Sequence, residues 1–193
     1  MKQKSNRQDM IDVFLETNSK LNLSAIRDPE GVYQKHILDS LELTQFNIIK
    51  PGDKVIDVGT WGGFPLMPLA RYYKDNQFFW LDARKKKIVA INGMLRELGI
   101  HNAKALRGRA EEHKERYDVL TARAVAYADK LLPWIHKLVK SGWYFVLYKP
   151  DSPGEFDVLD RQCDRYGLVI TYIHKYSLFE WDITRILYII KKE

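Results

Sequence analysis

The feature that most constrains the fold of this chain is an alternation of short apolar runs with amphipathic stretches, which begins at residue 54. Five runs have the length of strands and are separated by segments with helical spacing: KVIDVG, QFFWLDA, NAKAL, YDVLTA and WYFVLYK. Strands that alternate with helices form βαβ units, which build a parallel sheet with helices on its faces. The pattern therefore predicts an α/β protein with a mostly parallel sheet.

The two ends of the chain depart from this alternation. Residues 6–20 and 29–46 carry helical spacing, which predicts an N-terminal helical cap. After a helix at about 153–166, two strand-like runs, GLVITYIHKYS and TRILYIIKK, follow each other with no helix between them. Such a pair predicts a C-terminal antiparallel hairpin that adds an edge to the sheet.

Composition favours one folded domain in a reducing compartment. Hydrophobic residues make up 46% of the chain and charged residues 29%, as in ordinary soluble proteins. No apolar run approaches the ~20 residues of a membrane span, and the first twelve residues lack the apolar core of a signal peptide. We therefore expect a cytoplasmic protein with a single domain over 1–193, formed by a cap at 1–50 and a core at 51–193. Its one cysteine, Cys163, has no partner for a disulfide, and no cluster with metal-ligand spacing predicts a metal site.

The net charge of +6 favours a polyanionic partner. Lysines 85, 86 and 87 follow Asp82 and open a helical pattern, where cations face the unfavourable positive end of the helix dipole. We therefore take Lys85, Lys86 and Lys87 as candidate contacts to RNA phosphates. The alternative is an ordinary solvated helix face.

A glycine turn follows the first predicted strand, in KVIDVGTWGGFPLMPLA at residues 54–70. Strand, glycine-rich turn and helix in this order hold nucleotide-like ligands in α/β proteins, because the backbone comes close to the ligand. Gly59 begins the turn, and Asp82 ends the second strand 82 − 59 = 23 positions later, where a carboxylate accepts ribose hydroxyls. The alternative for Asp82 is a helix cap. Five alternating strands followed by a terminal hairpin fit a Rossmann-like class I methyltransferase more closely than a nicotinamide dehydrogenase, and the dehydrogenase fingerprint G-x-G-x-x-G does not fit residues 59–64.

Seven segments in order resemble the ribosomal small-subunit methyltransferase G family, also called glucose-inhibited division protein B: NLSAI, KHILDSL, IDVGTWGGFP, LDARKKKI, GRAEE, TARAVA and TRILYIIKK. The resemblance covers most of the chain. It implies an enzyme that transfers a methyl group from S-adenosylmethionine to N7 of one guanine in 16S rRNA. It also implies, as partner, either free 16S rRNA or a precursor of the small ribosomal subunit, and we expect a monomer.

The resemblance also implies a set of cofactor-binding residues. It places Gly59, Gly63 and Phe64 at the cofactor, with the Gly59 backbone near its amino-acid end, and Asp82 at the ribose. Ala110-Glu111 is similar to the family's adenine contact. From the residues alone, the first turn of a solvated helix is the preferred interpretation of this pair.

Two residues at predicted strand ends and one on the predicted helix 29–46 are further candidates. Arg123 ends the fourth strand, and the resemblance implies that it binds the cofactor carboxylate or a target phosphate; the alternative is a salt bridge to a neighbouring helix. The resemblance implies that His36 faces the substrate; the alternative is a local ion pair with Asp39. Lys149 ends the fifth strand and either contacts RNA or is an exposed lysine. Since guanine N7 carries a free lone pair, no general base is required, and His36 and Arg123 are the only catalytic candidates.

One departure from the family pattern keeps other functions open. Trp61 stands where the family has the middle glycine of the turn, although Gly62 can take part of the strained conformation. We expect an active methyltransferase whose Trp61 indole swings outward. The alternatives are a non-catalytic RNA-binding or ribosome-assembly protein that has lost the cofactor, and a class I methyltransferase with another substrate.

Overall fold

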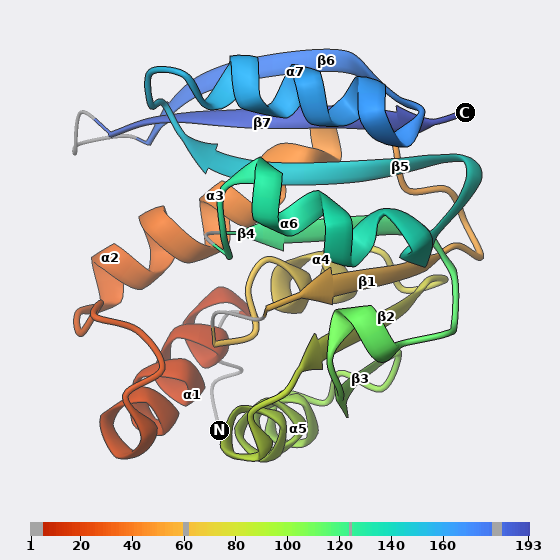
Figure 1. Cartoon of the computed structure of the whole chain (residues 1–193). Helices are drawn as coiled ribbons and strands as arrows, with labels where there is room; N and C mark the ends of the chain where they lie inside the picture. The colour runs from red at the N-terminus through yellow and green to blue at the C-terminus, as the bar shows by residue number, and fades with distance from the viewer. Residues whose placement is uncertain (1–5, 60–61, 124, 179–182) are drawn as a thin grey trace.

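The computed structural model describes residues 6–59, 62–123, 125–178 and 183–193, and its centre is one seven-stranded sheet (Figure 1). The strands are β1 Lys54–Val58, β2 Gln77–Asp82, β3 Ala103–Arg107, β4 Tyr117–Arg123, β5 Val139–Pro150, β6 Leu168–Leu178 and β7 Ile183–Lys192. They are ordered β3-β2-β1-β4-β5-β7-β6. The first five pair in parallel, and β7 lies antiparallel between β5 and β6. The predicted sheet with its closing hairpin is confirmed.

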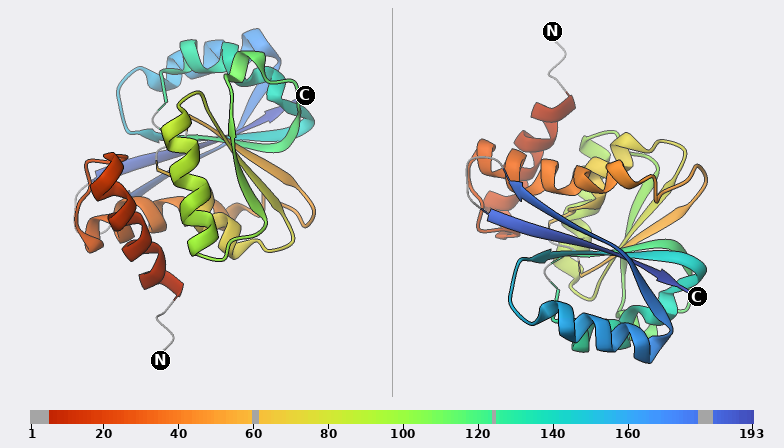
Figure 2. Two further views of the ribbon diagram at one scale, coloured as in Figure 1. Left: turned by 90° about the horizontal axis from the view of Figure 1, so that it is seen from below. Right: turned by 90° about the horizontal axis from the view of Figure 1, so that it is seen from above.

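Helices cover both faces of the sheet (Figure 2). On one face lie α6 (Ala128–Ile135) and α7 (Glu155–Tyr166), and on the other lie α1 (Asn6–Leu21), α4 (Leu66–Tyr72) and α5 (Lys85–Glu97). The central strand β4 is buried along its whole length, as expected of a strand covered on both sides. None of the helices in the described part of the chain is long and apolar enough to cross a membrane.

The second N-terminal segment is helical from Pro29 to Phe46 but changes its winding three times. It consists of α2 (Pro29–Val32), the π-helix η1 (Tyr33–Leu38), α3 (Asp39–Leu41) and the 3₁₀ helix η2 (Glu42–Phe46). Its start is capped by Asp28, whose carboxylate accepts a hydrogen bond from the Gly31 N–H at 2.7 Å. The π turn is a difference from the single helix predicted, and it carries His36 into the protein interior.

The N-terminal helices pack directly on the sheet layer. The Phe14 ring of α1 meets the Phe64 ring edge-on, with centroids 5.2 Å apart, and both side chains are fully buried in one continuous cluster with residues of β1 and β2. The cap and the core thus share apolar surface at the carboxyl ends of the strands, the edge where α/β sheets bind ligands.

Candidate active site

The glycine turn after β1 is held against the neighbouring strand. Gly59, Gly62 and Gly63 have φ angles of +77°, +69° and +98°, which side chains rarely adopt. The Gly59 N–H donates to the Leu81 carbonyl at 3.0 Å, so the turn lies beside the end of β2. A Cβ on Gly59 would lie 2.8 Å from a Val125 methyl group, which makes this a close approach of backbone to its surroundings. Trp61, with its predicted orientation, lies outside the described residues.

Asp82 ends β2 directly next to this turn. One carboxylate oxygen accepts the Arg84 backbone N–H at 2.8 Å, and the other lies 3.3 Å from the Lys87 ammonium. Arg84 is the residue directly before α5, and α5 has no side-chain cap at this position, so the contact to Asp82 is a turn before the helix and not the predicted helix cap. These two contacts leave part of the Asp82 carboxylate unused, because a carboxylate offers about four acceptor sites.

The three lysines at the start of α5 separate into two kinds. Lys85 and Lys86 are exposed, whereas Lys87 folds back onto Asp82 and is mostly covered. Of these three lysines, Lys85 and Lys86 therefore have ammonium groups that a phosphate can reach from the surface.

The residues predicted at the adenine follow β3, the strand beside β2. Ala110 and Glu111 belong to the single 3₁₀ turn η3 (Ala110–Glu112), with Ala110 buried and Glu111 exposed. The Gly108 N–H donates to the Asp82 carbonyl at 3.2 Å, which joins this loop to the end of β2. The turn brings Ala110 and Glu111 to the same sheet edge as Gly59 and Asp82, and the helical structure at this point is limited to the single turn η3.

The side chains of His36 and Phe64 lie between the cap and the glycine turn. Both are fully buried, and their rings stack with centroids 4.7 Å apart. Burial and the nearby Arg123 guanidinium lower the pKa of His36 to about 3, so its imidazole is neutral at physiological pH. Asp39, the predicted partner of His36 in a local ion pair, has its carboxylate 3.1 Å from the Arg123 guanidinium.

Arg123 instead joins the end of β4 to the helical segment above it. Its guanidinium is buried, pairs with the Asp39 carboxylate at 3.1 Å, donates to the Lys35 carbonyl, and lies 3.3 Å from His36 Nδ1. Because the guanidinium can only donate, His36 Nδ1 accepts there and its Nε2–H faces the Ser24 hydroxyl at 3.1 Å. The alternative of a salt bridge to a neighbouring helix is thus confirmed, and the same side chain also lines a cavity.

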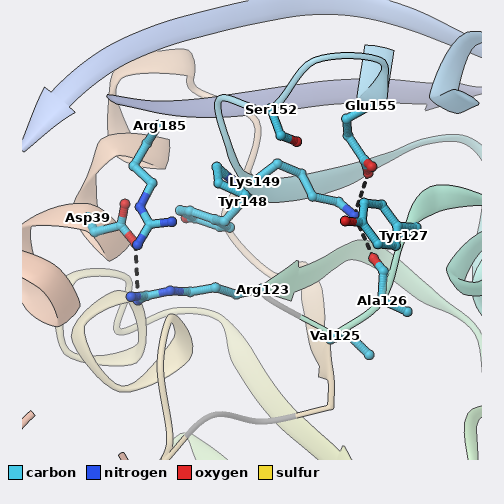
Figure 3. A pocket seen from close by; sticks show the side chains of 11 residues that line it. Asp39, Arg123, Val125, Ala126, Tyr127, Tyr148, Lys149, Ser152, Glu155 and Arg185 are labelled. Carbon is cyan, nitrogen blue, oxygen red and sulfur yellow. Dashed lines mark hydrogen bonds and ion pairs between the residues drawn. The ribbon is translucent and has the colours of Figure 1, made fainter. Parts of the chain in front are cut away.

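This cavity, of about 370 Å³, opens beside the ends of β4 and β5 (Figure 3). Its main polar lining is Asp39, Arg123, Tyr148, Lys149, Glu155 and Arg185. Figure 3 shows Asp39, Arg123 and Arg185 at one end, and Lys149, Glu155 and Tyr127 at the other. Val125 also lines the cavity, so its wall is continuous with the packing around Gly59.

Lys149 differs from the sequence-based expectation of an exposed lysine. It is 6% exposed, and its ammonium lies 2.7 Å from Glu155 Oε1 and donates to the Ala126 carbonyl at 2.6 Å. The position of Lys149 at a strand end does not by itself predict a buried acid on the next helix. As it lies, Lys149 can meet a group that enters the cavity but not a phosphate on the outer surface.

Comparison with known proteins decides the family. A family model described as rRNA small subunit methyltransferase G matches residues 3–177. Two curated relatives of that name are 33% identical, from Clostridium novyi, and 36% identical, from Lachnoclostridium phytofermentans. Each match covers 94% of this chain, and 77% and 78% of the respective relative. The chain belongs to the rRNA small subunit methyltransferase G family.

Solved structures agree with this family at the level of the fold. A SAM-dependent methyltransferase from Aquifex aeolicus superimposes with a TM-score of 0.66 at 17% identity, covering 91% of this chain and 97% of that one. A ribosomal protein L11 methylase from Lactobacillus delbrueckii gives 0.63 at 13% identity, covering 82% and 79%. The predicted Rossmann-like class I methyltransferase fold is confirmed, and membership of a methyltransferase family disfavours the non-catalytic alternative.

Sequence reasoning missed two residues of the candidate site, Glu155 and Arg185. Glu155 looks like an ordinary acid in the first turn of a helix, and Arg185 lies in a strand run whose apolar residues carried the prediction. Glu155 follows Lys149 across the short loop at the end of β5, but this spacing alone does not predict that the two side chains are buried and paired. Nothing local marks Arg185, since it reaches the cavity through the pairing of β7 with β5.

Proposed function

We propose that this chain transfers a methyl group from S-adenosylmethionine to N7 of a guanine in 16S rRNA. The observation that carries the proposal is the hydrogen bond from Gly59 to Leu81, because it holds the glycine turn of β1 beside the Asp82 carboxylate at the end of β2. A backbone turn without Cβ atoms next to an acid is the arrangement that α/β folds use for a nucleoside. Family membership supports the rRNA substrate.

The residues present suit such a cofactor. Gly59 and Gly63 give backbone that a ligand approaches closely, and Asp82 keeps acceptor capacity for ribose hydroxyls beyond its two contacts. Ala110 and Glu111 stand on the adjoining loop, where a backbone group and a carboxylate suit an adenine edge. The Phe64 ring is fully buried, so we assign it to supporting the turn from below. S-adenosylmethionine, when bound, supplies an activated methyl group.

The chain's own contribution to the chemistry is positioning. Guanine N7 has a free lone pair and no proton to remove, so proximity and orientation supply most of the acceleration. Arg123 is held from three sides and gives a fixed cation at the border of the cofactor turn and the cavity. His36 is a positioning residue, because its buried neutral ring reaches Arg123 and Phe64.

The partner we propose is 16S rRNA, free or within a precursor of the small subunit, bound by the chain as a monomer. The exposed lysines 85 and 86 supply phosphate contacts at the edge of the sheet where the site lies.

Titration calorimetry with S-adenosylmethionine tests the proposal first. We expect the wild type to bind and Asp82→Asn to bind at least about tenfold more weakly, because hydrogen bonds to a charged group are worth about 1.5–3 kcal/mol. Asp129→Asn, an exposed acid in the first turn of α6, is the matched control and should bind like the wild type.

The second arm measures transfer of a labelled methyl group to 16S rRNA and locates it by the strand cleavage that N7-methylguanine permits. Binding followed by labelling of guanine N7 supports the proposal. A wild type that binds no cofactor, while Trp61→Gly gains binding, would overturn it in favour of the RNA-binding protein.

A further inference from the structure

The cavity contains a buried carboxylate with an unused oxygen. Glu155 is 3% exposed and stands at the first position of α7. Its Oε1 pairs with Lys149 at 2.7 Å, while its Oε2 is buried and has no hydrogen-bond partner in the described part of the chain. Buried polar atoms normally have partners, and a charged one is costly to leave without one. The site is therefore suited to a ligand that brings hydrogen-bond donors.

Lys149 places a donor next to this acceptor. An ammonium has three N–H groups, and two are accounted for by Glu155 Oε1 and the Ala126 carbonyl. Both side chains line the same cavity (Figure 3). The wall thus offers one carboxylate acceptor and one ammonium donor side by side, and their mutual ion pair fixes both in place.

This pair matches the Watson–Crick edge of guanine. Guanine carries two adjacent donors, N1–H and the N2 amino group, followed by the acceptor O6, whereas adenine carries an acceptor at N1. We propose that Glu155 binds N1–H and the N2 amino group of the target guanine, with Lys149 at O6. The inference rests on the proposed function and adds to it the residue that selects the base.

The position of the cavity agrees with this assignment. The Val125 side chain lies between the cavity and Gly59, so a base bound in the cavity lies next to the proposed cofactor turn. At the mouth, the Tyr127 side chain is 67% exposed and offers an aromatic face to a base that has left its stack. With its Watson–Crick edge against Glu155 and Lys149, the guanine leaves N7 uncovered for the reaction.

The experiment compares guanosine with inosine at the target position of a synthetic RNA. Inosine keeps N1–H, O6 and N7 but lacks the N2 amino group, so it removes one donor without touching the reacting atom. We expect wild-type kcat/KM for the inosine RNA to be about tenfold or more below that for guanosine, as for a buried site built around a substrate donor.

Glu155→Gln should remove this preference. The amide oxygen of the new side chain turns to the Lys149 ammonium, which leaves an NH₂ group facing the donors of the base. We expect the variant to lose activity on guanosine RNA and to treat the two RNAs within about threefold of each other. Asp157→Asn removes an exposed acid from the same helical turn and should keep the wild-type preference.

The outcomes separate the two proposals. A wild type that methylates no RNA overturns the proposed function. A wild type that methylates guanosine and inosine equally overturns only the Glu155 inference, and it does so even if Glu155→Gln fails to fold. A preference retained in a folded Glu155→Gln protein, checked by its melting curve, reduces Glu155 to a partner of Lys149 with no part in reading the base.

Discussion

Arg123 stabilises the molecule as well as the site, because its buried guanidinium is the counter-ion of the buried Asp39 carboxylate. Breaking a buried ion pair from one side leaves an uncompensated charge. We therefore expect Arg123→Ala to abolish methyl transfer and to lower the unfolding free energy by about 3–5 kcal/mol. Urea denaturation measures this loss.

The double variant Arg123→Ala with Asp39→Asn is the control for that loss, since it removes the orphaned charge. It should recover part of the stability but none of the activity. Equal stability of Arg123→Ala and wild type would contradict the prediction and would mean that the ion pair contributes little.

Buried His36 makes stability depend on pH. With a native pKa of about 3 and an unfolded value near 6.5, only the unfolded chain binds a proton between these limits. Stability should therefore fall as the pH falls through this window, by up to about 1.4 kcal/mol per pH unit. Urea midpoints at pH 7 and pH 5 measure the effect.

The comparison with His36→Asn isolates that contribution. Asp57, whose pKa is raised by complete burial, acts in the opposite direction in both proteins and cancels in the difference. The variant should be less stable at pH 7 but less sensitive to acid. Parallel pH profiles of the two proteins would exclude His36 as the source.

At the scale of the element, we expect the lysines at the start of α5 to affect two different ligands. Replacing exposed Lys85 and Lys86 with Gln should weaken RNA binding and reduce the slope of log K against log salt by up to about 0.7–0.9 for each lost phosphate contact. Lys87→Gln should leave this slope unchanged and alter cofactor affinity instead, because Lys87 holds Asp82. An unchanged salt slope in the double variant would mean that Lys85 and Lys86 only form a solvated helix face.

The elements themselves were predictable where one strong local pattern decided them. The runs that became β1, β2 and β4 are apolar because both faces of the sheet are covered, and the Asp28-Pro29 start follows from capping geometry. The partners of side chains were not predictable in the same way. Arg123 finds Asp39, and Lys149 finds Glu155, through tertiary packing that no local spacing encodes.

At the scale of the whole molecule, the cap and the core should unfold together. Phe14 of the cap is buried against Phe64 of the core, so Phe14→Ala should cost about 3–5 kcal/mol of global stability. The hydrogen-exchange rates of the α1 amides should then change in parallel with those of the β4 amides across a urea series. Exchange of α1 amides at a rate independent of β4 would show a separately unfolding cap.

The place of β7 between β5 and β6 also constrains how the chain assembles during synthesis. The ribosome delivers β6 before β7, yet β6 has no strand of its own to join until β7 has paired with β5. A nascent chain that has emerged only through β6 can complete β1 to β5 but holds eleven strand residues without a partner. Since β7 also carries Arg185 to the cavity, the binding site is completed only after the rest of the sheet has been made.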